Sequence, residues 1–479
     1  MEFDCSAPYC RFFREICEIP HGSGNEKAIS DYLVDFAKAR GLAYMQDDLW
    51  NVIIRKPGTP GSENAPVLCI HAHTDMVCEK NKNTVHDFTK DPLRLMVTED
   101  GLLRADGTTL GADDGAGVAY MLAILDDDSL SHPPLECIFT TQEETGMYGA
   151  KALKAEDVKG HRMITLDGGG ETCTLLTSSG GCRVKVEKTM VQAPNAAPCF
   201  RISIRGLSGG HSGGEIHKEK GNANKLMARL LKEAMLEGLT FRLCGINGGL
   251  KENAIPRECD AVIAFPGEKE ALVQAVQASA ARIAKELEFS DSGFSVEVSS
   301  EAQCSAAFTE QDTRDAVDLL FLLPNGFQAR SMAIEGLTMT SLNLGVVFMQ
   351  GNTLVISATI RSMLASCIDH LYHQIGVLCR VFGAQLRRGA QYPGWSYNPK
   401  SPLREIFTQA VRELYGREPT LKGTHGGCET GIFSALHPDM DIITLGPVTR
   451  YIHTPDEELD LASFDRTYRL LTNIISKCG

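Results

Sequence analysis

Two histidines and an aspartate follow one short apolar run, and their types and spacing suit metal chemistry. Residues 67–70 are apolar and lead into His71, His73 and Asp75 in a His-x-His-x-Asp pattern. Open α/β sheets build their sites from polar residues at the carboxyl ends of buried strands. A neutral imidazole is the commonest protein ligand for a metal ion, and a nearby carboxylate can orient the ring. We therefore predict that this segment supplies part of a metal site.

Four more potential ligands follow strand-like segments or lie in the loops after them: Asp113, Glu144, Asp167 and His453. Singly, a loop carboxylate is usually solvated, and a histidine at a strand end is usually a hydrogen-bonded structural residue. Together with His73 they make two histidines and three carboxylates, a ligand set for two borderline divalent ions. One aspartate would bridge the ions, and the remaining positive charge would stabilise a hydroxide between them.

A carboxylate is also needed to take a proton from the attacking water and pass it to the leaving amine. Glu143 is the candidate, because it stands beside Glu144 directly after the apolar segment 135–141. Adjacent residues of such a loop can point opposite ways, one to the metal and one to the water. A Glu-Glu pair alone is a weak signal, since such pairs are common on protein surfaces. We predict Glu143 as the general base and acid.

The apolar periodicity predicts elements that would carry these residues. Residues 23–26 form a capping-box pattern before a helix with one apolar face. Alternating strands and helices of this kind predict a sheet with helices on both faces. The expected strands are 52–56, 67–70, 135–141, 163–166, 420–424 and 441–445, and the expected helices are 115–127, 402–415 and 460–476.

The middle of the chain has a different character. A Pro/Ala-rich linker at 191–198 precedes further strands and interleaved helices, which predict a second α+β domain inserted into the first. We place the first domain at residues 1–187 and 386–479 and the inserted domain at 188–385. The inserted strands are expected at 200–205, 260–265, 294–298, 342–348 and 354–360, with helices at 222–237, 269–287, 313–323 and 366–383.

Bulk properties exclude several classes of protein. A length of 479 residues favours two or three domains. The net charge of −14 argues against a nucleic-acid partner, because such proteins need basic surface. No apolar run approaches the ~20 residues of a membrane helix, and no secretory signal is visible, so we expect a cytoplasmic protein without a membrane partner. The 16 cysteines are scattered without a Cys-x-x-Cys pair, which favours reduced thiols over a disulfide framework.

The motifs as a group resemble the di-zinc aminoacylase/carboxypeptidase/dipeptidase superfamily. More narrowly, the chain is similar to the bacterial aminoacyl-histidine (Xaa-His) dipeptidases of the carnosinase type, and the similarity spans nearly its whole length. The motifs of the superfamily cover residues 71–77, 110–117, 142–146 and 446–457. The motifs of the narrower family cover residues 19–26, 86–92, 209–217, 221–225 and 252–257.

The resemblance implies a zinc-exopeptidase-like α/β catalytic domain with a central mixed sheet, plus an inserted α+β lid domain. It also implies roles for the metal ligands. His73 and Asp167 would bind one Zn²⁺, Glu144 and His453 would bind the other, and Asp113 would bridge both. Asp75 would orient His73, and Glu143 would be the general base and acid. His71 is then expected to be a packed strand residue, because His73 aligns with the family's ligand.

The resemblance further implies that the lid contributes to the site and that the protein is a homodimer through the lid. His211, in a glycine-rich loop, matches a lid histidine that would stabilise the oxyanion, in cis or across the dimer. Asn253 and Arg361 are candidates for binding the substrate, Arg361 through the substrate's carboxylate. Asn253 has a turn residue as its alternative, and Arg361 a structural ion pair. His425 matches a family motif near the substrate.

Two departures from the family pattern border the expected substrate pocket. Residues 168–170 are all glycine where acidic residues are usual, and residues 425–431 read His-Gly-Gly-Cys-Glu-Thr-Gly instead of His-Ala-Gly-Leu-Glu-Cys-Gly. Both bear on the preference for histidine more than on hydrolysis.

We therefore predict a metallodipeptidase that cleaves short unblocked dipeptides, Xaa-His and β-alanyl-histidine among them, with a hydroxide bridging two Zn²⁺. Mn²⁺ or Co²⁺ would suit the same ligands. The alternatives are hydrolysis of another small amide, such as an N-acyl amino acid or a different dipeptide, and a catalytically silent metal- or peptide-binding protein.

Overall fold

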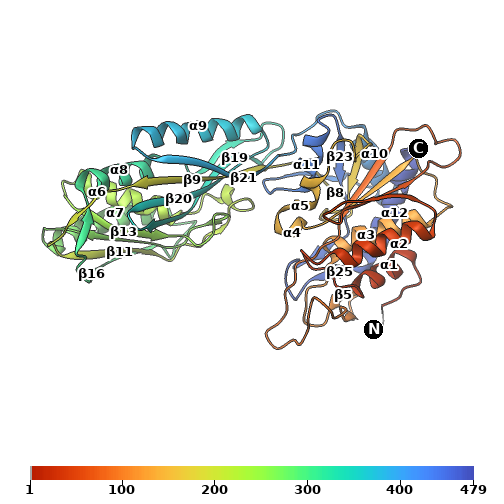
Figure 1. Ribbon diagram of the computed structural model, residues 1–479, viewed down its shortest axis with the longest axis horizontal. Coiled ribbons are helices and arrows are strands. Elements are labelled where there is room, and N and C mark those ends of the chain that lie inside the picture. The colour runs from red at the N-terminus through yellow and green to blue at the C-terminus, as the bar shows by residue number, and fades with distance from the viewer. Residues whose placement is uncertain (1–2) are drawn as a thin grey trace. The chain divides into compact units, whose positions relative to one another are not determined.

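The computed structural model describes residues 3–479, which form two compact units (Figure 1). Unit 1 runs to Thr177 and resumes over Trp395–Gly423 and Cys428–Gly479, and unit 2 comprises Ser178–Gly394 and Thr424–Gly427. The boundaries predicted at 187/188 and 385/386 are corrected, because they fall within β9 (Gly180–Thr189) and at the start of β21 (Gln385–Tyr392). These two strands pair with each other in the sheet of unit 2, a long-range pairing that composition does not reveal.

The predicted linker is also corrected. Residues 192–194 form the short strand β10 (Gln192–Pro194), which pairs with β17 (Ala306–Phe308) inside unit 2. The Pro/Ala composition of this segment therefore marks an edge strand and its loops, as proline in a sheet often does.

Unit 1 is built on a six-stranded mixed sheet in the order β1-β2-β6-β3-β7-β23. The first two neighbouring pairs are antiparallel, whereas β6, β3, β7 and β23 run parallel to one another. The strands are β1 (Ala43–Gln46), β2 (Val52–Lys56), β6 (Leu135–Thr140), β3 (Leu68–His73), β7 (Arg162–Thr165) and β23 (Asp441–Thr444).

Helices cover both faces of this sheet, as predicted. One face shares a single apolar core with five helices: α1 (Pro8–Cys17), α2 (Lys27–Ala39), α3 (Ala112–Asp126), α10 (Pro402–Tyr415) and α12 (Leu461–Lys477). On the other face Phe433 of α11 (Glu429–Leu436) packs against His71 of β3, with the ring centroids 4.8 Å apart. Every residue of β3 is buried, so the strand is covered on both faces.

Unit 1 also contains two smaller sheets. One has the order β24-β25-β5-β4, and the other pairs β22 with β8. Their strands are β4 (Leu95–Val97), β5 (Leu102–Ala105), β24 (Thr449–Arg450), β25 (Glu458–Asp460), β8 (Cys173–Ser178) and β22 (Thr420–Thr424).

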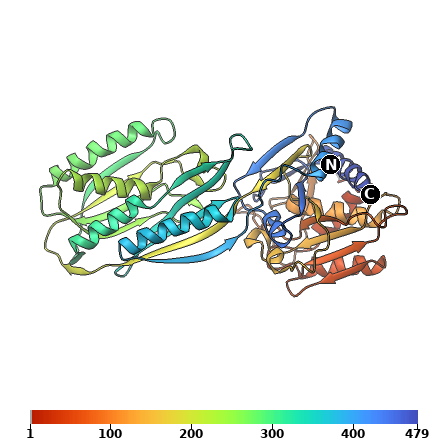
Figure 2. The ribbon, with the colours of Figure 1, turned by 90° about the horizontal axis from the view of Figure 1, so that it is seen from above.

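Unit 2 has a nine-stranded sheet in the order β16-β11-β15-β13-β19-β20-β9-β21, with β18 paired to β19. Its helices lie on one face of this sheet, where they share a separate apolar core (Figure 1 and Figure 2). The strands are β11 (Cys199–Arg205), β13 (Arg242–Gly248), β15 (Cys259–Ala264), β16 (Ser295–Glu301), β18 (Gly326–Arg330), β19 (Thr338–Gln350) and β20 (Thr353–Ser362). The helices are α6 (Ala223–Leu236), α7 (Lys269–Glu286), α8 (Glu310–Leu322) and α9 (Ala365–Val381). Among residues 3–479, no helix has the length and apolar character needed to cross a membrane.

Candidate metal centre

Three parallel strands of unit 1 deliver potential ligands to one edge of the sheet. His73 is the last residue of β3, Glu144 lies in α4 (Glu143–Gly146) just after β6, and Asp167 follows β7. The neighbouring strands are in register, with His73 opposite Thr140 and His71 opposite Thr165. Because parallel strands end at the same edge, the three side chains converge there.

Asp113 and His453 reach this edge from outside the sheet. Asp113 lies in the first turn of α3, and His453 lies in the loop between β24 and β25. His453 has a φ of 64°, and Gln142, which precedes Glu143, has a φ of 52°. Residues other than glycine rarely adopt such left-handed backbone conformations. Those that do are concentrated at functional sites.

The potential ligands fall into two groups that share Asp113. His73, Asp113 and Asp167 form one group and Asp113, Glu144 and His453 the other, with all ligand atoms of each group within 4.8 Å of one another. His73 Nε2 lies 3.2 Å from Asp113 Oδ1, and His453 Nε2 lies 3.1 Å from Asp113 Oδ2. The two oxygens of Asp113 therefore face different histidines, which is the placement that a bridging ligand needs. Glu143 joins a third group with His73 and Glu144.

The electrostatics of these residues reflect crowded negative charge. Burial raises the pKa of Glu143 to about 9 and that of Asp167 to about 7, and neighbouring carboxylates add to both effects. Hydrogen bonds to Asp113 and Glu144 raise the pKa of His453 to about 10. Burial alone would raise the pKa of Asp113, but hydrogen bonds from His453 and His73 lower it below its usual range. Cations placed among these groups would relieve the repulsion.

The residues present fit a pair of divalent metal ions. Imidazole nitrogen and carboxylate oxygen are donors that zinc, manganese and cobalt accept. Oε1 of Glu144 is buried and lies 2.8 Å from His453 Nε2, the same nitrogen that faces Asp113 Oδ2. His73 Nδ1 lies 3.0 Å from the carbonyl oxygen of Asp75, so Nδ1 donates its proton and Nε2 faces the site. This backbone bond fixes the ring orientation as outer partners of metal ligands do.

Asp75 connects His73 to the loop that carries Glu143. One carboxylate oxygen lies 3.5 Å from His73 Nδ1 and accepts a hydrogen bond from the backbone N–H of Glu143 at 2.9 Å. The other oxygen accepts from Ser23 Oγ at 2.6 Å and from the N–H of Glu144 at 3.3 Å. The predicted partner of His73 is therefore also an anchor for the two glutamates.

The capping-box prediction for residues 23–26 is wrong. Ser23 bonds to Asp75, and Glu26 is buried and accepts from the backbone N–H of Gln142 at 3.0 Å. Helix α2 begins at Lys27 without a side-chain cap. Both residues are used to hold the glutamate loop, a tertiary role that competes with local capping.

Glu457 is a site residue that sequence reasoning missed. Its buried carboxylate accepts backbone N–H bonds from Leu110, Gly111 and Ala112 at 2.8, 3.0 and 2.9 Å, and from Asp113 at 3.4 Å. It therefore fixes the turn that presents Asp113. The available signal was its place at the end of the motif that contains His453.

His71 is a packed strand residue and joins none of the ligand groups found among residues 3–479. Its Nδ1 lies 2.8 Å from Thr165 Oγ1, and its Nε2 lies 2.9 Å from Glu429 Oε2. Glu429, which the sequence did not single out, also accepts from Thr140 Oγ1 at 2.8 Å. This buried network lies directly beneath the carboxyl ends of β3, β6 and β7.

The glycine at position 168, one of the departures from the family pattern, has a steric cause. A Cβ on Gly168 would lie 2.9 Å from backbone atoms of Leu445, and a Cβ on Gly446 would collide with the carbonyl oxygen of Gly168. The two loops after β7 and β23 therefore touch through their backbones.

Unit 2 brings close together the four residues predicted to contact or border the substrate. His425, predicted within the first domain (386–479), belongs to unit 2 instead. His211, on β12 (Gly210–His211), pairs with Ala254 of β14 (Ala254–Ile255), next to Asn253. Asn253 lies in an exposed turn, so its alternative as a turn residue remains open. The His211 Nδ1 atom accepts hydrogen bonds from the N–H groups of Gly213 and Gly214 at 3.2 and 3.1 Å. The ring proton of neutral His211 is therefore on Nε2.

Arg361 and His425 complete this cluster in unit 2. Arg361, on β20, is 6% exposed, donates to Tyr392 Oη at 2.7 Å and has a buried Nε without a hydrogen-bond partner. No carboxylate of residues 3–479 lies within 4.0 Å of its guanidinium, so the structural ion pair weighed as an alternative is absent from that range. His425 lies between Ser179 Oγ and Ser341 Oγ, 2.8 and 2.7 Å from its two ring nitrogens. Burial, followed by the charge of Arg361, lowers the pKa of His425 to about 3, so it is neutral.

Known proteins resemble the chain over nearly its full length. It is 36% identical over 475 residues to the cytosol non-specific dipeptidase of Escherichia coli, a match that covers 98% of this chain and 97% of that protein. The crystal structure of aminoacylhistidine dipeptidase from Vibrio alginolyticus superposes with a TM-score of 0.93 at 32% identity, covering 99% of this chain and 97% of the other. Human carnosine dipeptidase 1 shares the fold, with a TM-score of 0.51 at 11% identity and coverage of 98% and 95%.

The family comparison agrees with the geometry of the site. The model of Peptidase family M20/M25/M40 matches residues 69–477, from the strand that ends in His73 to the last helix. This chain belongs to peptidase family M20/M25/M40.

Proposed function

We propose that this protein hydrolyses the peptide bond of short unblocked dipeptides in a metal-dependent reaction. The observation that carries the proposal is the pair of donor groups that share Asp113, with Glu143 beside them. A group of this composition suits attack by water on an amide, because it offers both cation sites and a separate carboxylate for proton transfer.

We further propose that two Zn²⁺ ions occupy the two groups, with Mn²⁺ or Co²⁺ as substitutes. His73 and Asp167 would hold one ion, Glu144 and His453 the other, and Asp113 both. When bound, such ions polarise a carbonyl and lower the pKa of water. Asp75 and Glu457 keep the ligands in place through the backbone bonds described above.

Glu143 carries the proton in this proposal. Its carboxylate takes a proton from the attacking water and delivers it to the nitrogen of the leaving amine. Asp75 holds the Glu143 N–H at 2.9 Å, which orients the side chain without occupying its carboxylate.

His211 and Arg361 have the properties needed to bind the substrate. With Nδ1 accepting two backbone N–H bonds, the Nε2–H of His211 is a neutral donor suited to a developing oxyanion. Burial and the charge of Arg361 lower the pKa of His211, which favours the neutral ring. Arg361, buried without a carboxylate partner in residues 3–479, suits the C-terminal carboxylate of a dipeptide. We assign Asn253 to the substrate backbone and His425 to the support of this surface.

The substrate range is proposed from the relatives. One relative is named a non-specific dipeptidase and another an aminoacylhistidine dipeptidase, so we propose Xaa-His and β-alanyl-His dipeptides among a wider set. The name of the first relative also supports a cytoplasmic location. We also propose a homodimer formed through unit 2. His211 would then act on substrate bound in its own subunit or in the partner subunit.

The first prediction concerns substrate and metal together. The protein should cleave Ala-His and β-Ala-His faster than N-acetyl-alanine, lose activity when fully stripped of metal by a chelator, and regain it with Zn²⁺. Amino-acid release measured by chromatography checks this. Cleavage that survives complete metal removal would contradict the metal-dependent mechanism. A preference for N-acetyl-alanine would reject the dipeptide substrate but not the metal-dependent mechanism.

The second prediction separates metal binding from proton transfer. Glu143→Ala should keep two ions per subunit but lower kcat by about 10²–10⁴-fold, because a positioned acid–base group contributes that much. Metal content by mass spectrometry and kcat on Ala-His check both parts. The exposed Glu156→Gln serves as the control and should match the wild type. Wild-type turnover in Glu143→Ala would reject the base assignment.

The third prediction concerns the substrate carboxylate. Arg361→Ala should lower kcat/KM for Ala-His by about 10- to 100-fold, the loss expected for charged hydrogen bonds worth about 1.5–3 kcal/mol. Hydrolysis of Ala-His amide, which lacks the carboxylate, should change little. The control is Arg387→Ala, an exposed arginine paired with Glu187. Equal losses of kcat/KM for Ala-His and for Ala-His amide would show that Arg361 does not bind the substrate carboxylate.

A further inference from the structure

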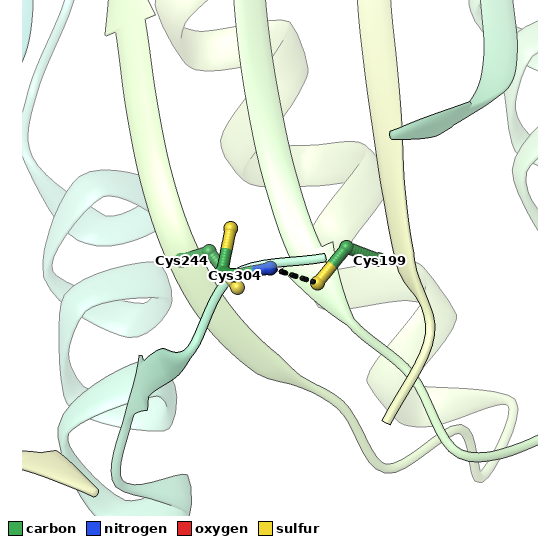
Figure 3. A group of neighbouring side chains, drawn as sticks. All are labelled: Cys199, Cys244 and Cys304. Carbon is green, nitrogen blue, oxygen red and sulfur yellow. Dashed lines mark hydrogen bonds between the residues drawn. The ribbon is translucent and has the colours of Figure 1, made fainter. Parts of the chain in front are cut away.

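Three cysteines of unit 2, none of them part of the metal centre, lie close together in space. Cys199 begins β11, Cys244 lies in β13, and Cys304 lies between β16 and β17. Their sulfur atoms all lie within 4.8 Å of one another, and all three are free thiols (Figure 3). All 16 cysteines are free, as predicted, but these three are clustered and not scattered.

The sheet explains how two of these residues meet across a strand. Both β11 and β13 pair with β15, where Ala264 lies opposite Cys199. Ala264 is buried in one small cluster with Cys199, and Cys244 and Cys304 pack against that cluster. The register between β13 and β15 shifts between Leu243 and Gly245, so Cys244 is the extra residue of a bulge. Bulges redirect side chains, and they are frequent next to functional sites.

The cysteines lie on the sheet face opposite the helices. Phe200 and Leu243, the neighbours of Cys199 and Cys244, belong to the core shared with the helices. Because side chains alternate along a strand, the cysteines point to the other face. There Cys199 is buried with Ala264 and Ala307, and Cys244 and Cys304 are partly exposed. A small ion can therefore reach the sulfur atoms.

Two N–H groups point at the sulfur of Cys199. The backbone N–H of Cys304 donates to Cys199 Sγ at 3.3 Å (Figure 3). Asn195 Nδ2 donates to the same sulfur at 3.6 Å. Asn195 is itself held by Arg242, whose guanidinium donates to Asn195 Oδ1 at 2.9 Å. Both donors direct N–H groups at the sulfur, and metal-bound sulfur ligands are often supported by such outer partners. A purely apolar packing role for the cysteines needs neither.

We propose that Cys199, Cys244 and Cys304 form a three-thiolate site for a soft monovalent cation, Cu⁺. No fourth histidine, cysteine or carboxylate in the described part of the chain, residues 3–479, joins the group. Structural zinc sites almost always use four ligands, whereas soft thiolates select Cu⁺. On binding, three S–H bonds break, three protons leave to solvent and three S–Cu bonds form. Copper enters and remains as Cu⁺, so no electron is transferred.

The test uses the reduced, zinc-loaded protein under anaerobic conditions. Cu⁺, supplied as its acetonitrile complex, competes with a Cu⁺-specific chelator, and the ultraviolet thiolate-to-copper absorption is followed. One Cu⁺ per subunit should be retained. Cys244→Ser and Cys304→Ser should each weaken retention by at least about tenfold, since loss of even an outer partner of a metal ligand costs that much.

Two controls make the result specific. Cys367→Ser, a partly exposed cysteine of α9 in the same unit, should retain Cu⁺ as the wild type does. Asp113→Asn should also retain it, because that change affects only the catalytic ligands. Equal retention in Cys244→Ser and the wild type, or a wild type without the absorption, would overturn the proposal.

A labelling experiment on the wild type avoids any effect of substitution on folding. Cu⁺ should protect Cys244 and Cys304 from alkylation by maleimide, while Cys367 reacts as before, as read by peptide mass spectrometry. Unchanged labelling of Cys244 and Cys304 in the presence of Cu⁺ would also overturn the proposal.

Discussion

The geometry of unit 1 depends on keeping several partly buried carboxylates close together. Asp113, Glu143, Glu144 and Asp167 share one edge of the sheet with two histidines. Isolated buried charges are unfavourable, so such a group needs cations or protons. Burial raises the pKa of Glu143 and of Asp167, which favours protons in that role when no ions are bound. Two divalent ions would replace them, and the surrounding fold is arranged to keep the ligands in position for that exchange.

Backbone hydrogen bonds hold the loops that carry these carboxylates in position. Glu457 holds the turn of Asp113 through its N–H bonds, and Asp75 holds the loop of Glu143 and Glu144. Each anchor is a buried carboxylate whose charge is stabilised by N–H donors, which avoids the need for a further cation. The partners distinguish the anchors from the candidate ligands. The anchors accept from backbone N–H groups, whereas the candidate ligand Asp113 faces histidine nitrogens.

Sequence reasoning located the strands and the ligands better than it located their supports. The apolar runs ending in His73, Glu144 and Asp167 are local patterns, so a sheet edge could be predicted from them. Glu457, Glu429 and Glu26 act through contacts with residues distant in sequence, which no local pattern reveals. The same reason explains the misplaced boundaries, because β9 and β21 are joined only by pairing across about two hundred residues of chain. The cysteine cluster escaped notice because its members are brought together by β15 and a bulge.

The central claim is that the two groups sharing Asp113 bind a pair of ions. X-ray absorption spectroscopy of the zinc-loaded protein, with zinc counted per subunit, tests it most directly. The account predicts two zinc ions in nitrogen and oxygen coordination, with metal–metal scattering at about 3.5–4 Å. A single zinc ion per subunit, or two ions without metal–metal scattering, would contradict it.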